Sequence, residues 1–471
     1  MKKKYFLVLF FLLISLPMLF AHKFAKYNIV IDSDCGIDDF RAITYFLASA
    51  DFNINAITTT DGVLEPQQGG NYLYELLKIY KHEGIKIAVG KNINASKKYS
   101  NHALNYWKKF FKNIENQQFE SSETVLYNAI SQNRNKTIII ALGPLTNISE
   151  LIENNKDIIP KIDYILWYSD YEDLPKGYNY EQNKTAFAQI QKYNIPLKCV
   201  SANALKFSST FTADCKTLNT KYSTTIINFF NTNDLTEFNL WDDLLPLYIL
   251  YPLQFKEVLI LNQITKITPT QNSYYENLIL SILNTNKKDA GVVFNEIPIE
   301  GFFIQKDVKE ILDTIINRYG YVEYKLVALT SEIHSHLGIY SIVGAKMGLR
   351  IMEYLHCGLD EINIESFAGD QAPLSCLNDG IQVGTGATIG YGAILINKNI
   401  EPHAEVVVNY NNRKISFKVN LVLIAEIEQN ISEIIKQYGF NTDMYWIKLR
   451  EQAIIYWKIL DRYEIFVIKE L

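Results

Sequence analysis

The sequence has few cysteines and no run of basic residues, and both absences narrow the class of protein. Its five cysteines are scattered along 471 residues and odd in number, which argues against a disulfide framework. At least one of them must be free, bound to metal or paired between chains. Lys and Arg number 46 against 51 Asp and Glu, for a formal net charge of -5. Without a basic face, a nucleic acid polymer is not expected as a partner.

Other absences exclude further classes. The sequence contains no internal repeat, no coiled-coil heptads and no glycine-rich phosphate loop with a lysine. Hydrophobic residues make up 48% and charged residues 21%, which is ordinary for a globular protein and excludes a disordered or collagen-like chain. Because 471 residues exceed what one hydrophobic core usually spans, we expect two domains.

The N-terminus has the pattern of a signal peptide. A basic start, Met1 to Lys4, precedes an apolar run from Tyr5 to Ala21 that is short for a membrane-spanning helix. We expect residues 1–21 to be removed and the protein to be exported, periplasmic or secreted. It would then have no stable membrane insertion. An uncleaved anchor is the alternative.

Short apolar runs alternate with helical stretches through the first half of the chain. Residues 39–50 and 72–82 have helical patterns, and the predicted strands are 27–31, 54–57, 85–89, 137–141, 164–167 and 197–200. This alternation predicts an α/β fold with an open, mostly parallel sheet and flanking helices. In such sheets ligands bind beyond the carboxyl ends of the strands.

Four aspartates follow the first predicted strand within eight residues: Asp32, Asp34, Asp38 and Asp39. Ionised carboxylates this close repel one another, and a divalent cation with oxygen ligands, such as calcium, relieves the repulsion. The alternative is a solvated cluster at the start of a helix, where the helix dipole favours negative charge.

Three further segments matter. Residues 141–148 (ALGPLTNI) close another predicted strand at the same edge of the sheet, and residues 181–183 (EQN) and 241–244 (WDDL) follow later in the chain. With the aspartate turn they resemble the inosine–uridine preferring nucleoside hydrolase family over residues 24–325. The resemblance implies a calcium-dependent hydrolase that cleaves the N-glycosidic bond of a small nucleoside-like substrate. It implies Asp34 as the general base; Asp34, Asp39, the Leu142 carbonyl and Asp242 as calcium ligands; support from Asp32; and substrate contacts from Asp38, Glu181, Asn183 and Trp241.

The chain departs from that family at several positions. Cys35 stands where the family often has proline, Val63 where it usually has a sugar-binding Asn, and Trp241 where many members have a His that protonates the leaving base. Residues 167–170 replace an expected glycine-rich turn. A nearby tyrosine could supply the missing acid. The competing hypothesis is a non-catalytic protein that binds a nucleoside or sugar.

The second half has a different character. Residues 307–319 are expected to form a helix that closes the first domain (22–325), and residues 320–329 to cross into a smaller α+β domain (326–471). Strands are expected within 411–426 and a helix over 444–463. His334 and His336 precede a glycine-spaced helix and, with Cys376, form a nitrogen and sulfur set suited to zinc. Helix capping and core packing remain the alternative for these residues.

Residues 326–470 resemble the FmdE-like family of formylmethanofuran dehydrogenase proteins, with its HxH and CxxDG segments. The resemblance implies His334, His336 and Cys376 as metal ligands in an accessory domain, with Asp379 and Thr385 lining the pocket. A third hypothesis assigns the chemistry to this domain, through its metal or the Cys376 thiol. Whether the chain forms a homo-oligomer is left open by the sequence.

Overall fold

A computed structural model describes residues 25–471, apart from 96–98, 134, 172–174, 202–204, 233–238, 262, 271–274, 286–296, 298, 300–303 and 360. The predicted signal peptide at 1–21 lies outside the described residues. Among the described helices, none is long and apolar enough to cross a membrane.

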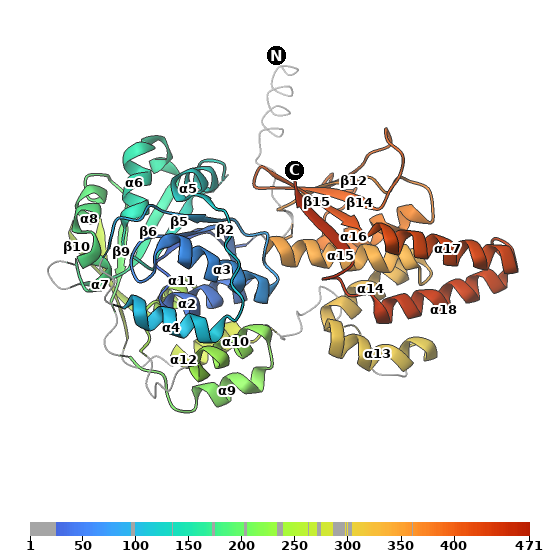
Figure 1. Cartoon of the computed structure of the whole chain (residues 1–471), viewed down its shortest axis with the longest axis horizontal. Helices are drawn as coiled ribbons and strands as arrows, with labels where there is room; N and C mark the ends of the chain where they lie inside the picture. The colour runs from blue at the N-terminus through green and yellow to red at the C-terminus, as the bar shows by residue number, and fades with distance from the viewer. Residues whose placement is uncertain are drawn as a thin grey trace, which may run out of the picture.

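The N-terminal half is built on a nine-stranded sheet of order β10-β11-β9-β6-β5-β1-β2-β3-β4 (Figure 1). Neighbouring strands are parallel except for the antiparallel pair β10 and β11. The predicted open, mostly parallel sheet is therefore confirmed. The strands are β1 (Tyr27–Ser33), β2 (Phe52–Thr59), β3 (Ile87–Val89), β4 (Glu120–Ser121), β5 (Thr137–Ala141), β6 (Ile162–Tyr168), β9 (Leu197–Val200), β10 (Phe255–Leu261) and β11 (Ile264–Pro269).

Apolar residues on both faces of the strands explain why helices cover both sides of this sheet. In β1, Ile29 and Ile31 belong to one buried cluster, whereas Val30, between them, belongs to another. The covering helices are α2 (Ile37–Ala48), α3 (Pro66–Tyr80), α4 (Ser100–Phe110), α5 (Ser122–Ser131), α6 (Thr146–Asn154), α7 (Tyr178–Gln182), α8 (Lys184–Ile190), α9 (Phe211–Leu218), α10 (Lys221–Asn231), α11 (Leu244–Leu250) and α12 (Tyr275–Leu283).

The C-terminal half has its own buried core and a five-stranded sheet of order β13-β12-β14-β15-β16. Its strands are β12 (Asn363–Ser366), β13 (Ile394–Ile396), β14 (Glu405–Tyr410), β15 (Arg413–Val419) and β16 (Phe466–Glu470). Its helices are α13 (Lys306–Tyr319), α14 (Tyr321–His334), α15 (Ile339–Leu355), α16 (Leu377–Thr385), α17 (Leu421–Tyr438) and α18 (Asp443–Ile459). The expected α+β character of this half is confirmed.

Three local predictions in this half were wrong. The helix expected at 307–319 does not close the first domain, because Ile311 and Ile315 of α13 are buried in the C-terminal core. Residues 320–329 are not a crossing segment, because α14 begins at Tyr321 and buries Tyr324 and Val327 in the same core. The strand region predicted at 411–426 ends earlier, at Val419, the last residue of β15. The Asn420 side chain accepts a hydrogen bond from the Val422 amide at 3.0 Å and so caps α17.

The two halves meet at the end of the large sheet where its strands begin. Tyr410 donates to Asn53 near the start of β2 (2.6 Å), and His356 contacts the carbonyl of Leu47 at the end of α2 (2.7 Å). The functional end of such a sheet is the opposite one, where the strands finish. The C-terminal domain therefore leaves the carboxyl ends of the strands open.

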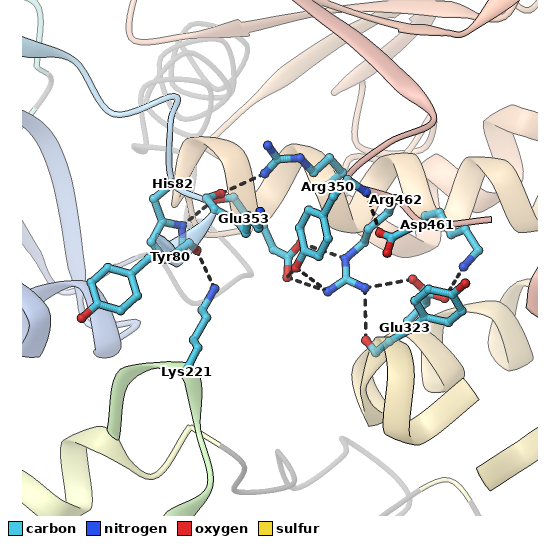
Figure 2. Close-up of polar contacts among 12 residues, drawn as sticks. Tyr80, His82, Lys221, Glu323, Arg350, Glu353, Asp461 and Arg462 are labelled. Atoms are coloured by element: carbon cyan, nitrogen blue, oxygen red, sulfur yellow. Dashed lines mark hydrogen bonds and ion pairs between the residues drawn. The ribbon is translucent and has the colours of Figure 1, made fainter. Parts of the chain in front are cut away.

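A buried polar network joins the halves (Figure 2). Glu353 of α15 accepts two hydrogen bonds from Arg462, both at 2.9 Å, while its backbone carbonyl contacts His82 Nδ1 at 2.5 Å. Arg350 reaches across to the carbonyl of Lys81 (2.9 Å). Because these charges are paired and hydrogen-bonded, the network fixes the relative position of the domains.

Two buried histidines face each other in this network. The rings of His82 and His356 lie edge to face, with centroids 4.6 Å apart. Burial lowers the pKa of both side chains, and their mutual repulsion lowers that of His82 further. The nearby cations Lys221 and Arg350 act in the same direction on His82. Burial therefore favours the neutral form of both rings in the folded protein.

This pair predicts that each histidine makes the folded state less stable as pH falls. Below about pH 6.5 the unfolded chain binds protons that the buried rings do not bind, which costs up to about 1.4 kcal/mol per pH unit for each histidine. Buried carboxyl groups with a raised pKa, such as that of Asp32, act in the opposite direction, so the histidine contribution is measured against a variant. Calorimetric unfolding at pH 7.5 and 5.5 should show that His356→Gln, which keeps a donor for Leu47, gains stability relative to the wild type on acidification. An unchanged difference between the two proteins would contradict the assignment.

Candidate functional site

The predicted acidic residues gather where strands of the large sheet end. Asp32 is near the end of β1, Asp34 follows that strand, and Asp38 and Asp39 lie in the first turn of α2. Asp242 comes from a distant segment, two residues before α11. The parallel topology thus brings together residues separated by about 200 positions in the sequence.

Asp38, Asp39 and Asp242 form the tightest part of the cluster. Each offers a carboxylate oxygen within 4.8 Å of the others, and no other described residues of the kinds that bind metals form such a set of three. The Oδ2 atom of Asp39 is fixed by the Ser33 hydroxyl at 2.6 Å and by the Asp34 amide at 3.1 Å. Asp242 Oδ1 is buried and has no hydrogen-bond partner. The cluster therefore has an unsatisfied acceptor among its own carboxylates.

Asp34 lies beside this set but outside the group of three. Its Oδ2 atom accepts a hydrogen bond from the Val63 amide at 3.1 Å. The backbone approaches closely here, because a Cβ atom on Gly62 would lie only 2.3 Å from the same oxygen. Asp32 behind it accepts from Thr58 (2.6 Å) and Asn147 (2.8 Å). Asp34 is thus held by backbone and Asp32 by side chains.

The acids have perturbed proton affinities. Burial, opposed by hydrogen bonds from Thr58 and Asn147, raises the pKa of Asp32 to about 7. Burial and the neighbouring Asp39 raise the pKa of Asp38 to about 7 as well. The pKa values of Asp34 and Asp242 are also raised well above the usual range, first by burial and then by neighbouring carboxylates. A bound cation would oppose each of these shifts.

Most of the other residues predicted to bind calcium or substrate already have hydrogen-bond or ion-pair partners. The Leu142 carbonyl accepts from Asn179 at 2.7 Å, and Glu181 is exposed and pairs with Lys184 at 2.8 Å. Asn183 caps α8 through the Ala186 amide (3.0 Å). Trp241 is exposed beside Asp242, with 42% of its surface accessible. Their predicted roles in holding calcium or substrate are untested by these contacts.

Sequence reasoning missed several residues that hold the site together. Asn147 joins two strands, because its amide donates both to Asp32 and to the Thr59 carbonyl (3.0 Å). A buried bidentate ion pair joins Arg41 of α2 to Asp243, at 2.9 and 2.8 Å. The second Asp of the WDDL segment was the available signal for this pair, since a buried carboxylate needs a partner.

Two tyrosines also stand near the acids. Burial is the main cause that raises the pKa of Tyr178, and the charges of Asp34 and Asp61 contribute. Burial and the charges of Asp170 and Asp242 raise the pKa of Tyr168. Tyr168 is the last residue of β6 and belongs to the segment 167–170 that replaces the expected glycine-rich turn. Phenolic hydroxyls therefore lie within electrostatic range of the cluster.

The backbone conformation of Cys35 in the aspartate turn is one that proline cannot adopt. Its φ of 63° is in the left-handed region, which a proline ring cannot adopt. Its amide also donates to Ser33 Oγ (3.0 Å) and to Asp39 Oδ2 (3.2 Å). The residue that the related family often carries at this position is thus incompatible with the turn seen here.

Comparison with protein families assigns the two halves. The model of the inosine-uridine preferring nucleoside hydrolase matches residues 29–271, slightly more than half of the chain. The chain belongs to this family. The hydrolase family match covers the nine-stranded sheet almost completely. A second model, described as FmdE, molybdenum formylmethanofuran dehydrogenase operon, matches residues 333–454, so the C-terminal half carries an FmdE domain.

Solved structures with a similar hydrolase domain are distant in sequence. The purine-preferring ribonucleoside hydrolase from Gardnerella vaginalis is 15% identical with a TM-score of 0.48, over 55% of this chain and 98% of that one. The inosine-uridine preferring nucleoside hydrolase from Bacillus anthracis is 13% identical with a TM-score of 0.47, over 55% and 99%. No curated protein matches the sequence.

The FmdE domain places its predicted metal ligands on one side of a closely packed helix pair. A Cβ atom on Gly344 of α15 would lie 2.2 Å from the Leu377 carbonyl, so only glycine permits this approach of α16. The approach brings Asp379 to His334, whose Nδ1 atom lies 2.9 Å from the carboxylate. His334 Nε2 is buried without a hydrogen-bond partner.

The other two predicted zinc ligands, His336 and Cys376, lie near the pair of His334 and Asp379. The three predicted ligands do not converge on one point among the described residues. His336 stacks near His334 (centroids 4.2 Å apart) and borders a cleft of about 410 Å³ lined also by Trp446 and Arg450. Cys376 is buried at the start of α16, and burial raises the pKa of its thiol to about 11. The backbone at the two histidines is not extended, because His334 ends α14 and Ser335 is left-handed (φ 60°).

The geometry of the aspartate turn predicts that Cys35→Pro is damaging, although the family resemblance alone would favour proline at this position. The substitution forbids the observed φ and removes the amide that binds Ser33 and Asp39, which should cost roughly 3 kcal/mol or more. Cys35→Ala keeps the backbone and loses only a small buried group, about 1 kcal/mol. Denaturant unfolding compares them. If the proline variant were as stable as the alanine variant, the turn would be wrongly described.

Proposed function

We propose that the chain is an exported, calcium-dependent hydrolase that cleaves the N-glycosidic bond of a ribonucleoside or related N-riboside. The family match supports cleavage of an N-glycosidic bond. The basic and apolar start of the sequence supports export. The observation that carries the proposal is the carboxylate set of Asp38, Asp39 and Asp242, with an unpartnered oxygen on the buried Asp242.

This set fits calcium by its chemistry. Calcium takes oxygen ligands from several carboxylates and backbone carbonyls, and it tolerates irregular geometry. Asp34, Asp39, Asp242 and the Leu142 carbonyl would hold the ion, with Asp38 close enough to share it or to bind the sugar. A calcium ion there supplies positive charge, which offsets carboxylate repulsion and orients the sugar hydroxyls.

The chain's own residues would then perform the hydrolysis. Asp34, held by the Val63 amide, takes a proton from water as the water oxygen bonds to the anomeric carbon. The bond from that carbon to the base breaks, and the base departs with its electron pair. Glu181 and Asn183 would exchange their present contacts for sugar hydroxyls. Once a donor has given the departing base one proton, the products are a free sugar and a neutral free base.

The leaving base needs a proton that Trp241 cannot give, because its indole N–H is too weakly acidic. The hydroxyls of Tyr168 and Tyr178 are the candidate donors, and because the pKa of each is raised, each keeps its proton until the base departs. The competing function is a nucleoside-binding protein without turnover. The replacement of two substrate-contacting residues by Val63 and Trp241 favours this alternative.

Asp34→Asn should reduce sugar release from a nucleoside or p-nitrophenyl riboside by about 10²–10⁴-fold, because it removes the base and keeps the shape. Asp163→Asn, an exposed acid far from the cluster, is the matched control and should leave the rate unchanged. Reducing-sugar assays on a nucleoside panel measure the effect. A wild-type protein that binds nucleosides tightly without turnover would establish the binding alternative.

We further propose that the FmdE domain is a zinc-binding accessory domain. Metal-binding histidines commonly bond a carboxylate through one ring nitrogen and the metal through the other. His334 has this arrangement, with Asp379 on Nδ1 and a buried, unpartnered Nε2. His336 and Cys376 would supply the remaining ligands.

His334→Ala should abolish the bound zinc of the purified protein, whereas His403→Ala, a histidine elsewhere in the same domain, should retain it. Elemental analysis by mass spectrometry gives the metal content per chain. Equal zinc in the two variants, or none in the wild type after growth with zinc, would refute the site.

A further inference from the structure

A pocket of about 290 Å³ lies between the two domains, away from both proposed metal sites. The hydrolase domain lines it through Asn55 of β2, Asn128 of α5 and Gln132, the residue after that helix. The C-terminal domain lines it through Asn411 and Asn412, the tip of the β14–β15 hairpin. Figure 1 shows the C-terminal domain, in orange and red, beside β2 and α5. Neither family match accounts for a pocket at this junction.

The pocket has fixed walls. Asn411 and Asn412 have φ values of 47° and 58°, the two left-handed residues of a tight hairpin turn, and Asn-rich turns of this type hold a defined shape. Asn411 donates to Asn55 at 2.8 Å across the domain boundary. Arg413, next in sequence, donates to the Gly84 carbonyl at 2.5 Å. The hairpin tip is therefore anchored to the hydrolase domain.

One buried group points to a ligand. Asn55 is only 9% exposed, and its side-chain oxygen is used by Asn411. Its Nδ2 atom has no hydrogen-bond partner. A buried amide donor without a partner costs free energy, about 1–3 kcal/mol, unless something in the pocket accepts from it.

The charged groups of the pocket neutralise one another. Lys86 pairs with Glu120 and Glu470, both at 3.2 Å, and Arg413 pairs with Glu470 at 3.0 Å. Two cations thus face two carboxylates. The pocket therefore offers no excess positive charge for a phosphate or carboxylate, and a neutral ligand fits it better.

The remaining lining groups define the ligand further. The amides of Asn128, Gln132 and the hairpin tip each present donors and an acceptor, which match the hydroxyl groups of a polyol. The described apolar lining is Val125 and Ala129, with no aromatic ring on which a nucleobase could stack. At roughly 30 Å³ per water-sized group, the volume holds about ten non-hydrogen atoms, the size of a pentose.

We propose that this junction binds a neutral monosaccharide. The sugar hydroxyls replace water on the pocket amides and accept a hydrogen bond from Asn55 Nδ2. Because residues of both domains line the pocket, bound sugar contacts the two domains at once and stabilises their association. The site is independent of hydrolysis at Asp34, which lies at the opposite ends of the strands.

Titration calorimetry of the full chain with D-ribose and a panel of neutral hexoses tests the proposal. The double variant Asn128→Ala/Gln132→Ala removes the side-chain amide of one residue in α5 and that of the residue after this helix, both of them exposed. It should weaken binding at least ten-fold for one or more sugars of the panel. Gln429→Ala, an exposed glutamine on α17, is the matched control. Asp34→Asn separates the two sites, because it should keep this binding even where catalysis is lost.

Three results would overturn the proposal. They are the absence of binding by every neutral sugar at millimolar concentration, equal affinity in the double variant and the control, and tighter binding of ribose 5-phosphate or glucuronate than of the neutral sugars. The last result would mean that the site selects an anion. A fourth contrary result, loss of ribose binding in Asp34→Asn alone, would assign the sugar to the hydrolase site instead.

Discussion

Mutual repulsion among buried carboxylates is the constraint on which the rest of the hydrolase domain depends. Asp32, Asp34, Asp39 and Asp242 are almost completely removed from water, and Asp38 is half-buried beside them. A fold does not retain such a set for stability, because each ionised neighbour raises the cost of the next. The surrounding fold instead supplies hydrogen bonds to Asp32, Asp34 and Asp39 and leaves Asp242 Oδ1 without one.

The supporting contacts show how this arrangement is maintained. Hydrogen bonds from Ser33 and the turn amides hold Asp39, those from Thr58 and Asn147 hold Asp32, and the Val63 amide holds Asp34. Arg41 neutralises Asp243, the one acid of this region that already has a buried cation among the described residues. The division is chemically sensible. Asp243 is a structural partner, whereas Asp242, its neighbour, keeps a free oxygen for function.

Much of this could be predicted from the sequence, for physical reasons that also set the limits. The strand-and-helix alternation fixes the parallel sheet, and a parallel sheet brings the ends of β1 and β5 to the same edge. The turn at Cys35 could not be predicted, because its left-handed backbone depends on amide contacts to Asp39 made after folding. The helix over 321–334 was missed because Gly320 was interpreted as the start of a linker rather than as the end of α13. The junction pocket depends on Asn411 meeting Asn55, 356 residues away, and no local pattern encodes that contact.

The central claim is that the acids at the end of the sheet bind a divalent cation, and a crystal structure of the protein grown with calcium tests it most directly. The account predicts a single strong density peak among Asp34, Asp39 and Asp242, with oxygen ligands at about 2.3–2.6 Å. Calcium-saturated crystals with only water between these carboxylates would contradict it.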